Sequence, residues 1–427
     1  MKIKTRACSL EQVLAKKRPK HKKPWRPNFL LQTVIRVLSE MELRPAKFTY
    51  TTEDMDKLGK KEPCLILMNH SSFVDLKIAS RIFYPKRYGI VCTSDGFVGF
   101  GKALLMRLLG CIPTRKFVTD VTLVQDMQYM LKQKKTSILI YPEASYSFDG
   151  TATPLPRKMG VLLKKLGVPV VTVITRGAFS VDPLYNGLQK RKAPISAQVK
   201  CLATAEELKT MSVAQLDALL DEAFTFDNFA WQQENDITIA EPFRADGLNR
   251  ILYKCPHCLA EGKMVGSGIH LTCNACGKQY ELTEKGYLNA LDGNSAFTHI
   301  PDWYAWQRQE VKKQLQEKTY RLEIPVKIGV MVDYKAIYMV GSGTLRHDSE
   351  GFCLTGCDGA LHYTQGPLAC YSVYSDYYWY EIGDVICIGN QEVLYYCFPE
   401  TDVVAKTRMA TEELYKMKKH RKTPVQV

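Results

Sequence analysis

The 427-residue sequence lacks any run of about 18 uninterrupted apolar residues, the length that a helix needs to cross a bilayer. A membrane-spanning helix is therefore not expected. The N-terminus also lacks the apolar core and the small-residue cleavage site of a secretory signal peptide. We therefore expect a cytoplasmic protein that reaches any lipid substrate from the surface, as a peripheral protein on the cytoplasmic membrane face.

Acidic residues are fewer than basic ones, with 44 Asp and Glu against 58 Lys and Arg and a formal net charge of +14. Excess positive charge predicts an anionic partner, which could be nucleic acid, a membrane surface or an acidic substrate. Composition does not choose among these three. The apolar fraction of 46% is ordinary for a globular protein, so buried cores are expected.

The positive charge is concentrated near the N-terminus, where residues 1–27 form a basic arm. We interpret this arm as mobile, because like charges repel and few apolar groups are present to order it. It would be a solvated tail, or it would be attracted to anionic lipid by about 1 kcal/mol per basic residue. The cations that crowd around Pro19 are Lys16, Lys17, Arg18, Lys20, Lys22 and Lys23.

Residues 28–45 follow the arm and have the pattern of an amphipathic helix. The helix would pack against the following domain, lie in the membrane interface, or do both. The basic arm just before it favours membrane contact. The apolar residues at helical spacing are Leu30, Leu31, Val34, Ile35, Leu38 and Met41.

Short apolar runs in the first half of the chain predict buried strands. They cover residues 64–68, 137–141 and 168–174, and helical segments separate them. Alternation of this kind predicts an α/β domain around a largely buried sheet. We assign residues 46–250 to this domain.

The last third of the sequence has a different character. Residues 287–319 predict a helical linker, and residues 320–420 contain short β-prone runs separated by turn residues. A terminal helix over about 400–418 closes this segment. Several antiparallel strands followed by one helix suggest a small barrel or sandwich, such as a pleckstrin-homology-like fold, with a lipid-binding or regulatory role as one interpretation.

Two Cys-x-x-Cys pairs lie in residues 251–286, which we assign to a zinc ribbon. Four thiolates at this spacing can close a tetrahedron around Zn²⁺, and a closed site of this kind is structural. His257 lies inside the first pair and is not expected to be a ligand. Five basic residues against three acidic ones between positions 250 and 285 do not favour a nucleic-acid partner. The four predicted ligands are Cys255, Cys258, Cys273 and Cys276.

His70 follows the first apolar run, and Asp75 lies five residues later. A helix beginning near Ser71 would bring the carboxylate back toward the imidazole. Such a pair suits general-base catalysis, in which the imidazole takes a proton from an attacking hydroxyl and the carboxylate orients the ring. By spacing alone, however, a histidine at a strand end is more often a structural hydrogen-bonding residue.

Four segments, in order, change this interpretation. They are Asn69-His70-Ser71-Ser72-Phe73-Val74-Asp75, Gly110-Cys111-Ile112-Pro113-Thr114-Arg115, Tyr141-Pro142-Glu143-Ala144-Ser145-Tyr146-Ser147 and Val168-Pro169-Val170-Val171-Thr172. Their order and spacing resemble the four motifs of the glycerolipid acyltransferases, the 1-acylglycerol-3-phosphate acyltransferase superfamily. The resemblance covers roughly residues 60 to 180.

The resemblance implies acyl transfer from a thioester, either acyl-CoA or acyl-carrier protein, to the hydroxyl of a lysophospholipid. His70 would deprotonate that hydroxyl and Asp75 would orient His70. Arg115 would hold the acceptor's phosphate, for which a guanidinium fork is well matched. Glu143 would position the acceptor's glycerol part or organise the pocket. The other substrate-binding candidates in the motifs are Asn69 and Ser145.

The third motif departs from the family pattern at two positions. Ala144 replaces the usual glycine, and Tyr146 replaces the usual arginine. Tyrosine cannot supply the missing positive charge, so one phosphate contact is in doubt. Arg157 and Lys158 would compensate for it, or they would be an ordinary solvated pair on the surface.

Three functions are therefore compatible with the sequence. The first is a peripheral acyltransferase of phospholipid biosynthesis that converts 1-acylglycerol-3-phosphate into phosphatidate at an anionic membrane surface. The second keeps the same chemistry with another lysolipid or alcohol as acceptor, an alternative that Tyr146 motivates. The third is a non-catalytic lipid- or protein-binding protein built around the zinc ribbon.

Overall fold

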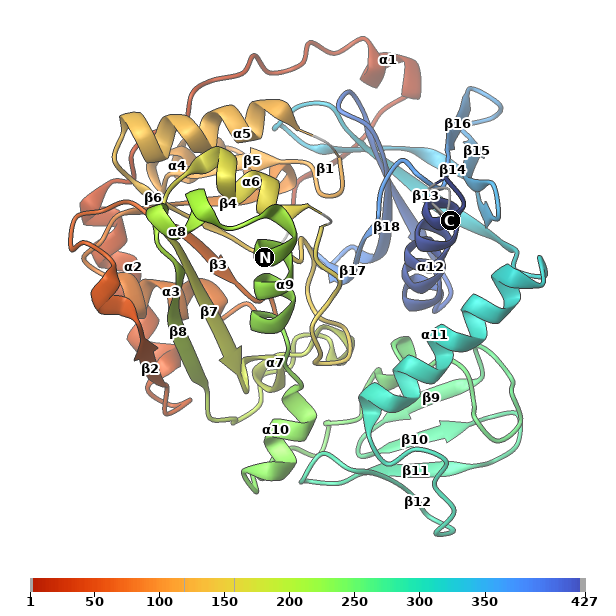
Figure 1. Cartoon of the computed structure of the whole chain (residues 1–427). Coiled ribbons are helices and arrows are strands. Elements are labelled where there is room, and N and C mark those ends of the chain that lie inside the picture. The colour runs from red at the N-terminus through yellow and green to blue at the C-terminus, as the bar shows by residue number, and fades with distance from the viewer. Residues whose placement is uncertain (1–2, 119, 157, 423–427) are drawn as a thin grey trace, which may run out of the picture.

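The computed structural model describes residues 3–118, 120–156 and 158–422, with side chains up to residue 419. Three sheets organise the molecule (Figure 1). A seven-stranded α/β unit lies at the left of Figure 1, a β-rich unit at the upper right, and a four-stranded unit at the lower right. Among the described residues, no helix is both long and apolar enough to cross a membrane.

The α/β unit is built on a sheet with the strand order β2-β8-β7-β3-β6-β4-β5. Neighbouring strands are parallel, except that β8 runs antiparallel to β7. The apolar runs of the sequence are β3, β6 and β7, which confirms the α/β prediction. The strands are β2 (Thr49–Glu53), β3 (Leu65–Met68), β4 (Tyr88–Thr93), β5 (Cys111–Thr114), β6 (Ser137–Ile140), β7 (Val170–Arg176) and β8 (Ser196–Ala203).

Successive residues of β3 face two different cores. Ile66 and Met68 pack on the side of α3, whereas Leu65 and Leu67 pack on the side of α5, α6 and α9. Burial on both faces explains why the strand is a continuous apolar run. The helices of this unit are α3 (Asp75–Phe83), α4 (Lys102–Leu108), α5 (Val121–Gln128), α6 (Met159–Leu166), α7 (Ala178–Val181), α8 (Ala205–Thr210), α9 (Val213–Ala223) and α10 (Asn228–Glu234).

The N-terminal segment is ordered by contacts with the far end of the chain. Strand β1 (Thr5–Ala7) pairs in parallel with β14 of the β-rich unit, and helix α1 (Leu10–Leu14) buries Leu10 and Val13. The expectation of a mobile arm over residues 1–27 is therefore wrong for this first part. An exposed sheet edge offers unpaired backbone groups to an extended segment, and the arm uses that edge.

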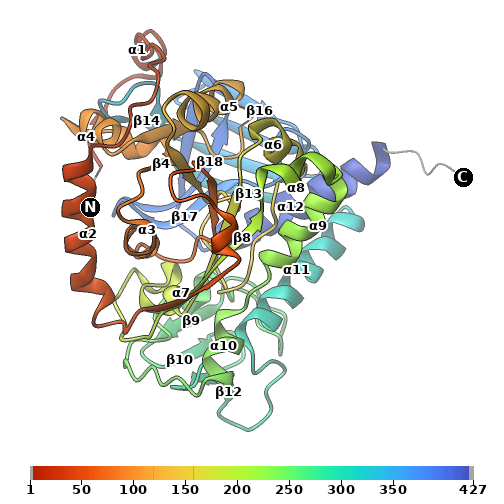
Figure 2. The ribbon, with the colours of Figure 1, turned by 60° about the vertical axis from the view of Figure 1, so that its left-hand side comes forward.

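Helix α2 (Phe29–Leu43) begins at its cap residue Asn28 and packs along α3 (Figure 2). Its buried side includes Ser39 and Leu43, and Glu40 pairs there with Arg81 of α3. The side that faces the domain is therefore largely polar and is not the apolar side that the pattern predicted. The opposite side leaves large apolar residues exposed, with Leu30 at 74% and Met41 at 73% of their full accessibility. Packing within the domain therefore does not account for the apolar side of the helix.

The β-rich unit is an antiparallel sheet with the order β16-β15-β14-β13-β19-β18-β17, followed by helix α12 (Val404–Lys422). Helix α11 (Ile300–Gln316) precedes the sheet and packs against α12. The β-rich character is confirmed, and the more specific pleckstrin-homology-like assignment stays a prediction. The strands are β13 (Leu322–Met331), β14 (Ile337–Asp348), β15 (Gly351–Gly356), β16 (Leu361–Gln365), β17 (Tyr374–Trp379), β18 (Gly383–Gly389) and β19 (Leu394–Pro399).

The four-stranded unit contains the spaced cysteines. Its antiparallel strands are β9 (Met264–Ser267), β10 (His270–Cys273), β11 (Gln279–Leu282) and β12 (Leu288–Ala290). The predicted helical linker over residues 287–319 therefore begins as a strand. In β12 burial alternates along the chain, with Leu288 and Ala290 inside, which is the period of a strand and not of a helix.

Candidate active site

The end of strand β3 presents His70 at the edge of the sheet. Asn69, just before it, is fully buried, and its amide bonds the backbone N–H of Thr175 at 2.8 Å and the backbone oxygen of Thr175 at 3.1 Å. These bonds join β3 to β7. Asn69 was expected to bind substrate, but its side chain instead fixes the strand end from which His70 projects.

His70 and Asp75 form the pair that their spacing predicted. Nδ1 of His70 and Oδ2 of Asp75 are 2.9 Å apart, and the same oxygen accepts the backbone N–H groups of Ser71 and Ser72. Asp75 is the first residue of α3, so the turn between strand and helix returns its carboxylate to the imidazole. With Nδ1 engaged by Asp75, Nε2 is the nitrogen that remains to accept a proton.

Two tyrosine rings enclose the imidazole of His70. The centroids of Tyr141 and Tyr146 lie 3.9 Å and 3.7 Å from that of His70, in stacked geometry. Tyr146, which stands where the family has arginine, therefore packs on the base. Burial lowers the pKa of His70 well below its usual range, and the positive charge of Lys116 lowers it further. Burial raises the pKa of Asp75, and the backbone N–H groups of Ser71 and Ser72 that donate to its carboxylate oppose that rise. The imidazole is thus neutral at pH 7, as a general base requires.

Glu143 organises the loop after β6. One of its oxygens accepts the backbone N–H of His70 at 2.9 Å, and the other accepts the backbone N–H of Thr153 at 2.7 Å and its hydroxyl at 3.0 Å. The carboxyl is buried, which raises the pKa of Glu143 to about 7. Of the two roles considered for Glu143, these contacts favour organising the pocket.

The backbone at Ala144 shows why the family has glycine at this position. Ala144 has a left-handed backbone, with φ of 55°, which glycine adopts freely and which costs an L-residue roughly 1 kcal/mol or more. The hydroxyl of Ser145 is buried and, within the described part of the chain, has no hydrogen-bond partner. Ser145 is not among the residues that line the cavity beside His70.

A cavity of about 840 Å³ opens beside His70, and both large units line it. The α/β unit contributes Phe73 and Leu76, and β17 of the β-rich unit contributes a run of aromatic side chains. This second wall was not predicted from the sequence. The signal was present as an aromatic run, Tyr374–Tyr380, but nothing in the run indicated which other unit it would face.

The predicted phosphate-binding cations are divided between different places. Arg115 lines the cavity, but its Nη1 donates to the backbone oxygen of Asn390 at 2.8 Å. Lys158 is exposed and lines a separate hollow of about 340 Å³ that does not include His70. Arg157 lies outside the described residues. Lys116, which the sequence analysis did not single out, lines the cavity with His70.

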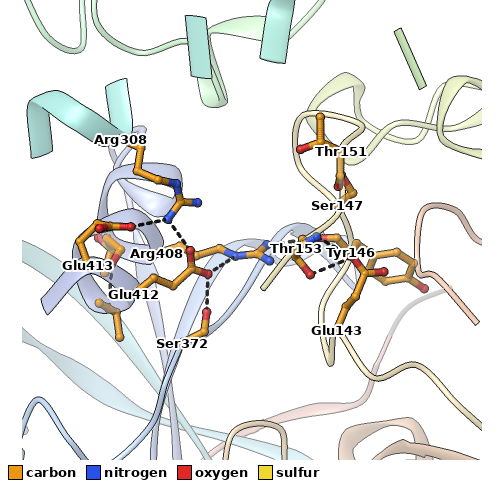
Figure 3. A network of polar contacts seen from close by, with 12 residues as sticks. Glu143, Tyr146, Ser147, Thr151, Thr153, Arg308, Ser372, Arg408, Glu412 and Glu413 are labelled. Atoms are coloured by element: carbon orange, nitrogen blue, oxygen red, sulfur yellow. Dashed lines mark hydrogen bonds and ion pairs between the residues drawn. The ribbon is translucent and has the colours of Figure 1, made fainter. Parts of the chain in front are cut away.

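A buried ion network connects the loop after β6 to helices α11 and α12 (Figure 3). Arg408 of α12 donates to the backbone oxygen of Tyr146 at 3.0 Å and to Glu412 at 3.2 Å. Arg308 of α11 donates to Glu412 at 2.6 Å. Burial alone would raise the pKa of Glu412, but Arg308, Arg408 and Ser372 hold the pKa down at about 2.

Replacing Glu412 by glutamine is expected to lower the free energy of unfolding by about 3 kcal/mol, because two buried guanidinium groups lose their counter-charge. The depressed pKa of Glu412 means that its contribution is present above pH 4.5 and is lost as the pH falls toward about 2. Urea unfolding at pH 7 measures the loss, with Glu317→Gln, at the exposed C-cap of α11, as the control. Equal midpoints for both variants would contradict the prediction.

The four predicted zinc ligands come together in the four-stranded unit. Their sulfur atoms all lie within 4.8 Å of one another. Sγ of Cys255 is 3.9 Å from that of Cys276, and Sγ of Cys258 is 3.7 Å from that of Cys273. A tetrahedron with Zn–S bonds of about 2.3 Å requires separations of about 3.8 Å. The donor set and its size therefore fit one tetrahedral metal ion.

Comparison with known proteins agrees with this geometry. Residues 49–176 match the family model described as Acyltransferase, so this segment is an acyltransferase domain. The resemblance that the four motifs indicated is therefore confirmed.

Two known proteins are similar to parts of the chain. Human 1-acyl-sn-glycerol-3-phosphate acyltransferase beta is 24% identical over 174 residues, which cover 40% of this chain and 61% of that protein. The chain thus spans about three-fifths of the length of this relative. The crystal structure of the 1-acyl-sn-glycerophosphate acyltransferase PlsC from Thermotoga maritima is similar over 45% of this chain and 78% of that one, at 15% identity and a TM-score of 0.34.

Proposed function

We propose that the protein transfers a fatty acyl group from an acyl thioester to the hydroxyl of a lysophospholipid. The proposed acceptor is 1-acylglycerol-3-phosphate, the product is phosphatidate, and the donor is acyl-CoA or acyl-carrier protein. The observation that supports this most is a neutral His70, oriented by Asp75, beside a largely apolar cavity in an acyltransferase domain. The cavity is large enough for an acyl chain and a small head group.

The chemistry follows from the geometry of the pair. Nε2 of His70 removes the proton of the acceptor hydroxyl while the oxygen attacks the thioester carbonyl. The C–O ester bond forms, the C–S bond breaks, and the proton is returned to the departing thiolate. Asp75 keeps the imidazole in the required tautomer and stabilises it while it carries the proton.

An acceptor panel tests this function. Purified protein is incubated with acyl-CoA or acyl-carrier protein and with 1-acylglycerol-3-phosphate, other lysophospholipids, glycerol 3-phosphate and uncharged alcohols. We expect the highest rate with 1-acylglycerol-3-phosphate. A higher rate with another acceptor would support the alternative that Tyr146 motivates, since its ring occupies the place of a cation. No transfer to any acceptor would favour the non-catalytic binding protein.

We also propose that the protein binds the anionic, cytoplasmic face of a membrane through α2 and its surroundings. The N-terminal end of α2 lies next to α4, where the backbone N–H of Asn28 donates to the backbone oxygen of Leu108 at 2.8 Å (Figure 2). Leu104 and Leu105 of α4 are exposed, as is the apolar side of α2. The segment just before α2 and helix α4 together line a hollow that contains basic side chains. These are Lys22, Lys23, Arg26 and Arg107. Exposed apolar side chains beside cations match the chemistry of an anionic lipid surface.

Replacing Leu30 and Met41 together by serine is expected to weaken binding to phosphatidylglycerol vesicles about tenfold or more, because each side chain loses apolar burial in the bilayer interface. Vesicle sedimentation measures the binding. Leu291→Ser, an exposed position in the four-stranded unit, is the matched control. If the double variant and the control bind alike, α2 does not contact the membrane.

The four thiolates of the ribbon would hold a structural zinc ion, which supplies cross-linking and no reaction chemistry. The fit of their sulfur positions to one tetrahedron supports this assignment.

A further inference from the structure

The second wall of the catalytic cavity has an unusual backbone. Strand β17 contains an irregularity between Asp376 and Trp379, where Tyr378 has a φ of 51°. The turn after the strand holds Tyr380 and Glu381 at φ values of 47° and 64°. Left-handed backbone at three non-glycine residues costs about 1 kcal/mol or more each and persists where the surroundings enforce it. These residues line the cavity with His70, so the irregular segment shapes the space beside the base.

Lys116 lies at the junction between this wall and the acyltransferase domain. Its ammonium group is 4.4 Å from the ring centroid of Tyr374 in β17 and 5.8 Å from that of Tyr146. Asp376 of β17 and Asp95 are the acidic groups that act on it electrostatically. Asp95 is already bonded to the hydroxyl of Tyr374 at 2.8 Å. Within the described residues, no hydrogen bond or ion pair is found for the ammonium group of Lys116.

We propose that Lys116, held against β17, binds the phosphate of the acceptor, so that the appended β-rich unit forms half of the acceptor's head-group site. The proposal rests on the acyl-transfer function and names the residue and the unit that select its acceptor. It also explains how an anionic head group can be held although Tyr146 supplies no charge.

The contacts in the cavity distinguish Lys116 from the cation that the motif suggests. Among the described residues that line the cavity, Arg115 and Lys116 are the lysine and arginine side chains. Arg115 is turned toward the backbone of Asn390, at the far end of β18. Lys116 faces aromatic rings, and its charge acts on His70. Lys116 is half-buried, so its ammonium group is only partly hydrated, and a phosphate oxygen in the cavity would give it a charge-assisted hydrogen bond.

Direct binding tests the site without any turnover. Dodecyl phosphate and the uncharged 1-O-dodecylglycerol are titrated calorimetrically into the full-length protein, with no acyl thioester present. Lys116→Gln is expected to lower the affinity for dodecyl phosphate at least about tenfold, because one charge-assisted contact is lost. The affinity for 1-O-dodecylglycerol should change by less than about twofold. Lys116→Arg should retain most of the affinity, since it keeps the charge.

Arg115→Gln provides the matched comparison. If this variant loses affinity for dodecyl phosphate and Lys116→Gln does not, the head-group site belongs to Arg115 and the proposal is overturned. Titration with CoA and with inorganic phosphate separates the possible sources of the anion. If Lys116→Gln selectively loses CoA binding, Lys116 binds the acyl donor and the proposal is overturned. An effect on the binding of inorganic phosphate alone would overturn it as well.

A measurement on the wild-type protein covers the case in which Lys116→Gln does not fold. Lysines are acetylated with acetic anhydride, and the modification of Lys116 is followed by mass spectrometry. Dodecyl phosphate should protect Lys116 several-fold and 1-O-dodecylglycerol should not. Equal protection by the two amphiphiles would show that the chain and not the phosphate covers this residue. Because neither measurement requires acyl transfer, a failure of the proposed reaction would not be confused with a failure of this site.

Discussion

Replacing His70 by alanine is expected to reduce acyl transfer about a thousandfold or more, because a positioned general base typically contributes factors of 10² to 10⁴. The fold should be unaffected. The imidazole makes its hydrogen bond to Asp75 and otherwise stacks on tyrosines, so its removal leaves space beside an existing cavity. Initial rates with 1-acylglycerol-3-phosphate vesicles, together with urea unfolding, measure both quantities.

Asp75→Asn separates orientation from proton transfer. The amide keeps the shape of the side chain but can hold the ring in the wrong tautomer, so we expect a loss of about a hundredfold or more with His70 still present. His362→Ala, at an exposed position of β16, is the control for histidine removal. Full activity in His70→Ala, with its unfolding midpoint unchanged, would rule out the proposed mechanism.

Among the substitutions considered, one that removes the metal from the cysteine cluster is expected to lower the stability of the protein most. Structural zinc contributes on the order of 10 kcal/mol to the folding of small zinc domains, so Cys273→Ser should melt the four-stranded unit well below the rest of the protein. Elemental analysis should find one zinc ion per wild-type chain and none in the variant. Cys353→Ser, in β15 and far along the chain from the cluster, is the matched control.

The consequences should extend beyond the ribbon. The backbone oxygen of Lys254, next to the first ligand, accepts the indole N–H of Trp303 at 2.9 Å, and its backbone N–H donates to Gln307 of α11. The same helix carries Arg308, which binds Glu412. We therefore expect Cys273→Ser also to lower acyl transfer, by a factor of a few. Unchanged zinc content and melting temperature would refute the structural role of the cluster.

Local pattern was sufficient for several elements of the fold. Strand β3 was predictable because a strand buried on both faces is an apolar run, and Leu65 to Met68 form one. The pairing of His70 with Asp75 depends on a single strand-to-helix turn. The four cysteines are close in sequence and converge through two short turns. In each case the residues that form the element or the contact lie within about 20 positions of one another in the sequence.

Contacts between distant segments could not be predicted in this way. The N-terminal strand was interpreted as part of a mobile arm because its partner, β14, lies more than 300 residues away. The role of Glu143 was left open because it depends on Thr153 and on the backbone of His70. Arg115 was assigned from its motif, yet its guanidinium meets Asn390 in another unit.

The sequence by itself determined the class of the domain, the pairing of His70 with Asp75, and the thiol cluster, since each depends on short-range spacing and on residue chemistry. The tertiary structure alone decided what surrounds the base: the tyrosine rings on His70, the position of Lys116, and the aromatic wall from β17. The physical reason is that burial and electrostatic environment arise when units distant in sequence pack together. The proton affinity of His70, and the selectivity of the cavity for the acceptor's head group, depend on that environment.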